Sequence, residues 1–183
     1  FNIARITWNE DLLANFLNPT IVFQGIAITP PPNAFLQATE QGQEILITNA
    51  MLSVFDSDKV IDLFSGCGTF TLPAAKRSEV LAIDKTKSML TAIDQAWRGT
   101  TGLKKVTSRS QDLFKEPVGK EELNSFDAAI IDRPRVGAEA QSHELAKSHI
   151  KRISSVSCNP RTFSRDAKIL VDSGFKIDWV QPI

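Results

Sequence analysis

Cys158 has the residue type and the sequence context of a nucleophile. It lies in the segment Ser-Cys-Asn-Pro-Arg-Thr, directly after a strand predicted at 153–157. Pro160 favours the first turn of a helix, so the helix is expected to begin immediately after Cys158. The positive end of the helix dipole and the nearby Arg161 both favour the thiolate, which is the form that attacks carbon. The alternative for a single cysteine is a small buried side chain at a strand end.

A glycine-containing loop precedes a strand that ends in an acidic residue. The segment 62–73 reads DLFSGCGTFTLP, and Gly66 and Gly68 allow a sharp turn and a close approach of the backbone to a ligand. Asp84 ends the next predicted strand, where its carboxylate can accept hydrogen bonds from both hydroxyls of a ribose. The pattern therefore indicates an adenosine ligand, with a plain strand–helix turn as the alternative. A nicotinamide-dependent oxidoreductase is disfavoured, because Thr71 stands where the dinucleotide fingerprint needs its third glycine.

Two further carboxylates follow predicted strands. Asp112 could accept from an adenine amino group, although on its own a surface aspartate is the favoured interpretation. Asp132 opens the segment Asp-Arg-Pro-Arg-Val-Gly, in which Pro134 stiffens the chain after the carboxylate. Arg133 and Arg135 suit a phosphate or carboxylate ligand. The alternative is a structural ion pair between Asp132 and one of these arginines.

The elements that must position these residues alternate between strand and helix. Strands are predicted at 60–64, 80–83, 106–108, 126–131, 153–157 and 175–180, helices at 39–54, from about 69, and at 87–97, 138–147 and 161–173, and a hairpin at 21–28. This alternation predicts an α/β fold with a mostly parallel sheet and helices on both faces. Five residues fall just beyond strand ends, where such sheets bind ligands: Gly66, Asp84, Asp112, Asp132 and Cys158.

Composition sets limits on the class of protein. The chain has 183 residues, enough for one α/β domain, and no apolar run long enough to cross a bilayer. Its net charge of zero argues against nucleic acid as a partner, yet residues 133–168 carry +5, from eight basic and three acidic residues. A solvated helical face is the other interpretation of that charge.

Two distant cysteines and two histidines predict no metal site, and Cys67 is interpreted as a packing residue. Without an export signal, a reduced cytoplasmic location is expected.

These motifs resemble the RNA 5-methyluridine methyltransferase family, which acts on bacterial ribosomal and transfer RNA. The matching segments are 33–37 (NAFLQ), 62–73, 132–137 and 157–162, and the resemblance runs from about Phe23 to the C-terminus. It implies a Rossmann-like class I methyltransferase fold with S-adenosyl-L-methionine as cofactor. It also implies that Cys158 adds to carbon 6 of uracil, so that carbon 5 takes the methyl group, on a base extruded from structured RNA. The cofactor-binding residues implied are Gln37, Phe64, Gly66, Gly68, Thr69, Asp84, Asp112 and Asp132, with Gln37 and Asp132 also near the uracil.

The chain departs from the family pattern in several places. Relatives carry Asp-Pro-Pro-Arg or Asp-Pro-Ala-Arg where this chain has Arg133 after the aspartate, and often Asn where it has Thr69. The family's proton-abstracting glutamate lies beyond Ile183, and the N-terminal RNA-binding domain and the cysteine cluster of some relatives are absent. The expectation is a remnant of a preceding region at 1–34 and a C-terminally truncated catalytic domain at 35–183. Such a fragment is expected to bind cofactor but to be inactive alone.

Two other functions stay open from the sequence. RNA cytosine-5 methyltransferases share this layout but place the nucleophile after the fourth strand in a Pro-Cys context. Here Pro134 is followed by Arg135, which favours uridine. A non-catalytic module that binds an adenosine nucleotide or RNA would leave Cys158 without a role.

Overall fold

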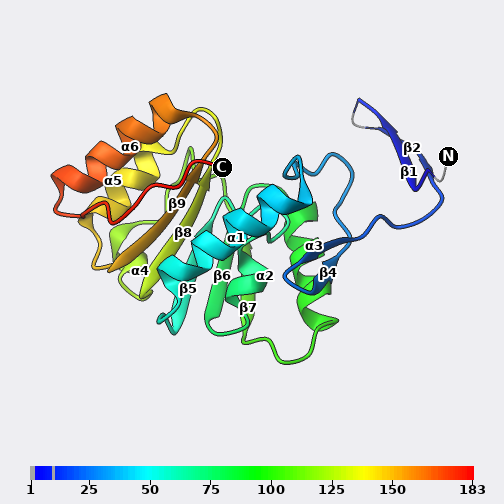
Figure 1. Ribbon diagram of the computed structural model, residues 1–183, viewed down its shortest axis with the longest axis horizontal. Helices are drawn as coiled ribbons and strands as arrows, with labels where there is room; N and C mark the ends of the chain where they lie inside the picture. Colours follow the sequence, from blue (N-terminus) through cyan, green and yellow to red (C-terminus); the bar gives the residue numbers. More distant parts are fainter. Residues whose placement is uncertain (1–2, 10) are drawn as a thin grey trace.

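A five-stranded parallel sheet forms the centre of the protein (Figure 1). The computed structural model describes residues 3–9 and 11–183. The sheet contains β5 (Lys59–Leu63), β6 (Glu79–Asp84), β7 (Val106–Ser110), β8 (Ala128–Arg133) and β9 (Arg152–Ser157). Their order is β7-β6-β5-β8-β9, and every pairing is parallel. The predicted α/β fold is confirmed, and β5 lies at the point where the strand order reverses.

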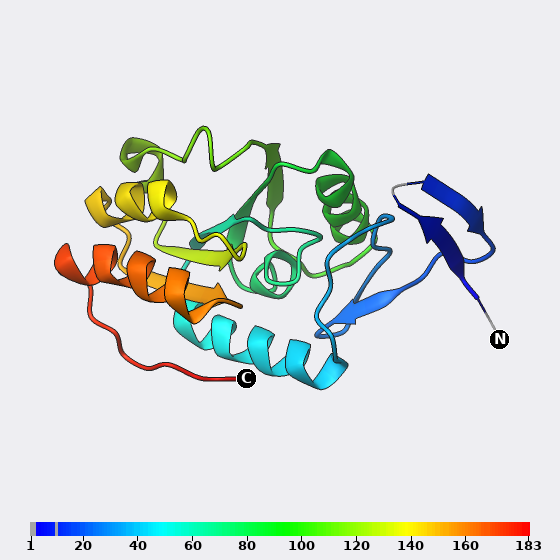
Figure 2. The ribbon, with the colours of Figure 1, turned by 90° about the horizontal axis from the view of Figure 1, so that it is seen from above.

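Helices cover both faces of this sheet (Figure 2). The first face carries α1 (Glu40–Val54), α2 (Thr71–Ala74) and α3 (Lys87–Arg98), and the second carries α4 (Lys120–Leu123), α5 (Glu139–Lys147) and α6 (Pro160–Asp172). Alternate strand residues serve the two faces, so that Val60 belongs to the first core cluster and Ile61 to the second. This alternation follows from the period of two in a strand. The short α4 was not predicted.

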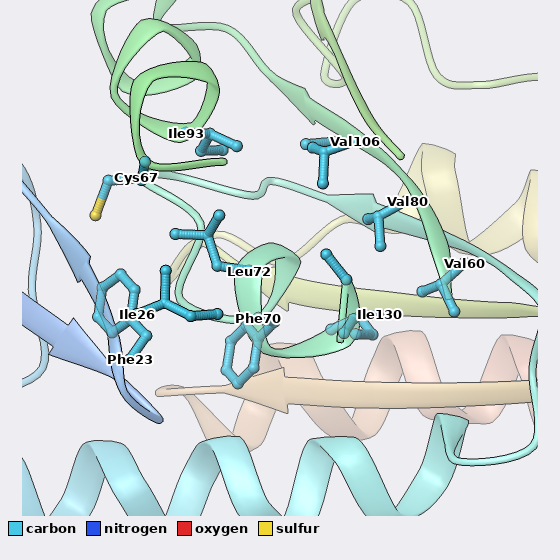
Figure 3. Close-up of a cluster of buried hydrophobic side chains, with 14 of the residues drawn as sticks. Phe23, Ile26, Val60, Cys67, Phe70, Leu72, Val80, Ile93, Val106 and Ile130 are labelled. Atoms are coloured by element: carbon cyan, nitrogen blue, oxygen red, sulfur yellow. The ribbon is translucent and has the colours of Figure 1, made fainter. Parts of the chain in front are cut away.

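Figure 3 shows the core cluster on the first face, which includes Cys67 from the loop after β5. Val60, Val80, Val106 and Ile130 come from four neighbouring strands and pack with Leu72, Ile93 and Phe70. Each fully buried side chain of this size contributes about 1.5–3 kcal/mol relative to an exposed one. The core therefore fixes the strand ends that carry the functional residues.

The N-terminal residues form two hairpins. The predicted hairpin is confirmed as β3 (Ile21–Phe23) paired with β4 (Ile26–Ile28), with positive φ at Gln24 and Gly25 in the turn between them. Phe23, Ile26 and Ile28 are buried in the first core cluster. A second hairpin, β1 (Arg5–Trp8) with β2 (Asp11–Asn15), was not predicted and projects from the rest of the protein (Figure 1).

The strand predicted at 175–180 is wrong. Residues 175–183 contain no strand or helix, and Ile177, Trp179 and Val180 are all exposed. The alternation of apolar residues there is typical of a strand, but a strand also needs a hydrogen-bonded neighbour, and this segment does not pair with β9. In the described ranges, 3–9 and 11–183, no helix has the length and apolar character needed to span a membrane.

Candidate active site

A long cavity begins at the carboxyl ends of the strands and continues along β9 to the amino end of that strand. It has a volume of about 2050 Å³ and extends from the loop after β5, past α1 and β9, to the C-terminal residues. The predicted site residues that line it are Gln37, Phe64, Gly66, Thr69, Asp84, Asp132 and Cys158. They come from four different strand ends and from the segment before α1, so the fold brings together residues that are far apart in the sequence.

The loop after β5 is held against the end of β6. Phe64 and Gly66 both have positive φ, 61° and 53°, which is unusual for phenylalanine and ordinary for glycine. The Gly66 amide donates to Asp84 Oδ2 at 3.0 Å, and the Thr86 amide donates to Asp84 Oδ1 at 2.8 Å. Asp84 therefore shapes the loop and lines the cavity at once.

Two of the predicted cofactor residues do not line the cavity. Gly68, with a φ of 90°, faces α3, and a Cβ at this position would lie 2.9 Å from Ile93 Cγ1. Asp112 accepts a hydrogen bond from the ammonium group of Lys85, at 3.1 Å, and this contact lowers the pKa of its carboxyl. Gly68 therefore allows close packing of α3, and Asp112 shapes the segment after β7.

The two cysteines have opposite environments. Cys158 is an exposed free thiol in the cavity wall, and α6 starts two residues later at Pro160, as predicted. Asn159 caps this helix, accepting a hydrogen bond from the Arg161 amide at 3.1 Å. Cys67 is buried in the first core cluster (Figure 3), and burial raises the pKa of its thiol to about 11. Of the two thiols, Cys158 has the position of a nucleophile, and Cys67 is the packing residue that was predicted.

Asp132 faces the cavity without an arginine partner among the described residues. Burial raises the pKa of its carboxyl to about 6. Arg133 turns to the opposite face of the sheet and pairs with Asp166, while Arg135 is exposed. The structural ion pair considered for Asp132 is therefore not formed, and Arg133, which lines the cavity but is only 2% exposed, is paired with Asp166 instead.

Asp62 is a buried carboxyl that the sequence did not single out. The Thr71 hydroxyl donates to its Oδ2 at 2.5 Å, and its Oδ1 has no hydrogen-bond partner among the described residues. Burial and, to a lesser extent, the neighbouring charges of Asp132 and Asp84 raise the pKa of Asp62 to about 7, although the hydrogen bond from Thr71 lowers it. An acidic residue inside an otherwise apolar strand was the available signal. Asp62 is therefore a third carboxyl near the loop after β5, in addition to Asp84 and Asp132.

Known proteins resemble this chain closely. No family model matches it. An RNA methyltransferase of Rhizobium meliloti is 43% identical over 181 residues, which are 99% of this chain and 44% of that protein. The 23S rRNA (uracil(1939)-C(5))-methyltransferase RlmD of Alteromonas mediterranea is 36% identical over 159 residues, 84% of this chain and 33% of that protein.

A solved structure shares the fold. The Pyrococcus abyssi tRNA (uracil-54, C5)-methyltransferase, crystallised with S-adenosyl-L-homocysteine, superimposes with a TM-score of 0.76 at 25% identity and covers 92% of this chain and 41% of its own. The chain thus spans less than half the length of the relatives it matches most fully. With a Rossmann-like sheet, a glycine loop and these relatives, the chain is similar to RNA methyltransferases, two of which are named for methylation of uracil at carbon 5.

Proposed function

We propose that the chain is the catalytic part of an S-adenosylmethionine-dependent enzyme that methylates carbon 5 of uridine in ribosomal or transfer RNA. The observation that carries the proposal is the exposed thiol of Cys158 in the same cavity as the glycine loop and Asp132. A non-catalytic binding module has no need of a free thiol at that place. The relatives support the substrate class, because two of them are named for uracil methylation of rRNA and tRNA.

The residues of the loop fit the proposed cofactor. No atom lies within 4 Å of the place where a Gly66 Cβ would stand, so the backbone here is open to an approaching ligand. Asp84, at the end of β6, offers carboxylate oxygens to the ribose hydroxyls, and Phe64 and Thr69 flank the same space. When bound, the cofactor supplies a methyl group carried on a positively charged sulfur. Gln37 and Asp132 would contact the uracil.

The role of Cys158 follows from the chemistry of uracil. Carbon 5 is a poor nucleophile in the aromatic base. The Cys158 thiolate would add to carbon 6, forming a sulfur–carbon bond while the 5,6 double bond opens toward the carbonyl at carbon 4. Carbon 5 then gains the electron density needed to accept a methyl group. A base then takes the proton from carbon 5, the electrons of that bond re-form the 5,6 double bond, and Cys158 leaves as a thiolate.

Two exposed arginines lie beside Cys158. Arg161 is in the first turn of α6, and the Arg135 carbonyl accepts from Asn159 Nδ2 at 2.9 Å, which holds the loop after β8 next to the same turn. These guanidinium groups can bind the phosphates that flank an extruded nucleotide. Local positive charge thus accompanies a net charge of zero.

A mechanism-based substrate tests the proposal. The full-length protein is incubated with S-adenosylmethionine and with tRNA or rRNA transcripts containing 5-fluorouridine, whose fluorine cannot leave as a proton does. A covalent protein–RNA band on a denaturing gel is expected for the wild type and for Cys67→Ala, and none for Cys158→Ala. Absence of the band with the wild-type protein, or its persistence in Cys158→Ala, contradicts the proposal.

A further inference from the structure

Arg133 is a buried charged residue beside the candidate site. Its side chain and that of Asp166 are both fully buried, with Arg133 Nε 3.4 Å from Asp166 Oδ2. Arg133 also donates to the Ser155 hydroxyl on β9, and its guanidinium carbon lies 5.8 Å from the centre of the Phe163 ring on α6. A buried charge is costly unless it is paired. The pair therefore joins the end of β8 to α6 at one defined position.

The same carboxylate holds the loop that follows β8. Asp166 Oδ2 accepts from the Ala138 amide at 2.7 Å, and Oδ1 accepts from Arg165 Nε at 2.8 Å. Arg165 in turn donates to the Val136 carbonyl at 3.3 Å. A Cβ on Gly137 would lie 2.9 Å from Asp166 Oδ2, which shows how closely the loop packs on α6. The loop and the helix thus form one tightly connected unit around Asp166.

Two residues of the proposed site border this unit: Asp132, proposed to contact the uracil, and Cys158, the proposed nucleophile. Asp132 immediately precedes Arg133, and Cys158 precedes Asn159, the cap of the helix that carries Asp166. In the register of β8 and β9, Arg133 is opposite Ser157. A shift of α6 along β8 would move Cys158 relative to Asp132, and the buried pair opposes that shift.

We propose that Arg133 and Asp166 are positioning residues that hold Cys158 at a fixed place relative to Asp132 for addition to the base. This inference rests on the proposed function of the site. Both side chains are fully buried, so both would act through the residues at the borders of the unit. Their removal is expected to slow covalent addition without weakening the binding of cofactor or RNA.

The test compares the full-length wild type with two variants. In Arg133→Leu/Asp166→Asn both charges are removed, so no lone charge is left buried, and the amide oxygen can still accept from Ala138. Asp166→Glu keeps the charges but lengthens the link by one methylene, and it serves if the double variant fails to fold. We measure the single-turnover rate of adduct formation with 5-fluorouridine RNA, and the Kd values for S-adenosylhomocysteine and RNA.

A positioning role predicts a rate about 10- to 100-fold lower in each folded variant, with both Kd values within twofold of wild type. A merely structural pair predicts either unchanged rates or a parallel loss of rate and of both affinities, and each of these results overturns the inference. Absence of an adduct with the wild-type protein contradicts the proposed function itself. A wild-type adduct together with equally fast folded variants contradicts only the positioning role.

Discussion

The backbone amide of Gly66 donates a hydrogen bond of 3.0 Å to the carboxylate of Asp84. This bond joins the loop after β5 to the end of the neighbouring strand β6. At the residue held in this way, Gly66, the backbone adopts a φ of 53°, a conformation that favours glycine. The conformation of the cavity wall therefore depends on a glycine and on a carboxylate that is itself a proposed ligand of the ribose.

Gly66→Ala is expected to weaken the binding of S-adenosylhomocysteine by tenfold or more, as measured by calorimetry. The methyl group would enter the cavity, and the positive φ costs a residue with a Cβ about 1–2 kcal/mol. Gly102→Ala is the matched control. Gly102 has a φ of 81°, has open space around a Cβ and does not line the cavity. The two variants should lose similar stability, and equal Kd values for both would contradict a ligand site at Gly66.

Iodoacetamide is expected to alkylate Cys158 in the native protein at least 100-fold faster than Cys67. The Cys158 thiol is exposed, whereas Cys67 is 2% exposed and burial raises its thiol pKa to about 11. Mass spectrometry of the digested protein measures the two rates. Both cysteines should react once denaturant is added, which controls for peptide recovery. Rapid labelling of Cys67 under native conditions would show that the core around the loop opens easily.

The buried strands were the most predictable part of this fold. The segments 60–63, 80–83 and 128–131 are apolar except for Asp62, and all their residues except Leu81 are buried. Such segments are recognised as strands without knowledge of their neighbours. The segment 175–180 has an equally suggestive pattern, but pairing depends on a partner strand that no local pattern specifies. The same limit applies to β1 and β2, which pair with each other and not with the central sheet.

The site was predictable in outline and less so in its contacts. Strand-end positions placed Asp84, Asp132 and Cys158 on one edge, because all parallel strands end there. The partner of Arg133 could not be inferred, since Asp166 lies on α6, three elements later in the chain, and the two side chains meet only in the folded protein. The roles of Gly68 and Asp112 depend likewise on Ile93 and Lys85, which approach only in the folded chain.

Gly68→Ala is expected to destabilise the protein by about 3 kcal/mol, in contrast to the smaller effect of Gly66→Ala. Its Cβ would lie 2.9 Å from Ile93 Cγ1 and 3.3 Å from Leu72 Cγ, so overpacking adds to the cost of a positive φ. A double-mutant cycle with Ile93→Ala, followed by urea denaturation, isolates this contact. The double variant should be more stable than the sum of the single effects by about 1–2 kcal/mol. Simple additivity would mean that the cost comes from the backbone alone.

The buried Asp62 should make the stability of the ligand-free protein depend on pH. Its carboxyl has a pKa of about 7 in the folded protein and 3.8 as the ordinary value. Between these values the unfolded chain has released the proton that the folded chain retains, so the free energy of unfolding falls as pH rises from 4 toward 7. Each unit of pKa difference corresponds to about 1.4 kcal/mol. Asp62→Asn removes this pH-dependent contribution, and the stability of the variant relative to wild type is expected to increase steadily over that range in urea denaturation experiments.

Asp132 also has a raised pKa, but it remains in both proteins, so the difference between the two curves largely isolates Asp62. Thr71→Val serves as a second variant, because loss of the hydroxyl that donates to Asp62 should raise the carboxyl pKa further and extend the loss of stability to higher pH. Parallel curves for wild type and Asp62→Asn would mean that Asp62 titrates in the folded protein as it does in the unfolded chain, and that the carboxyl beneath the loop is open to water.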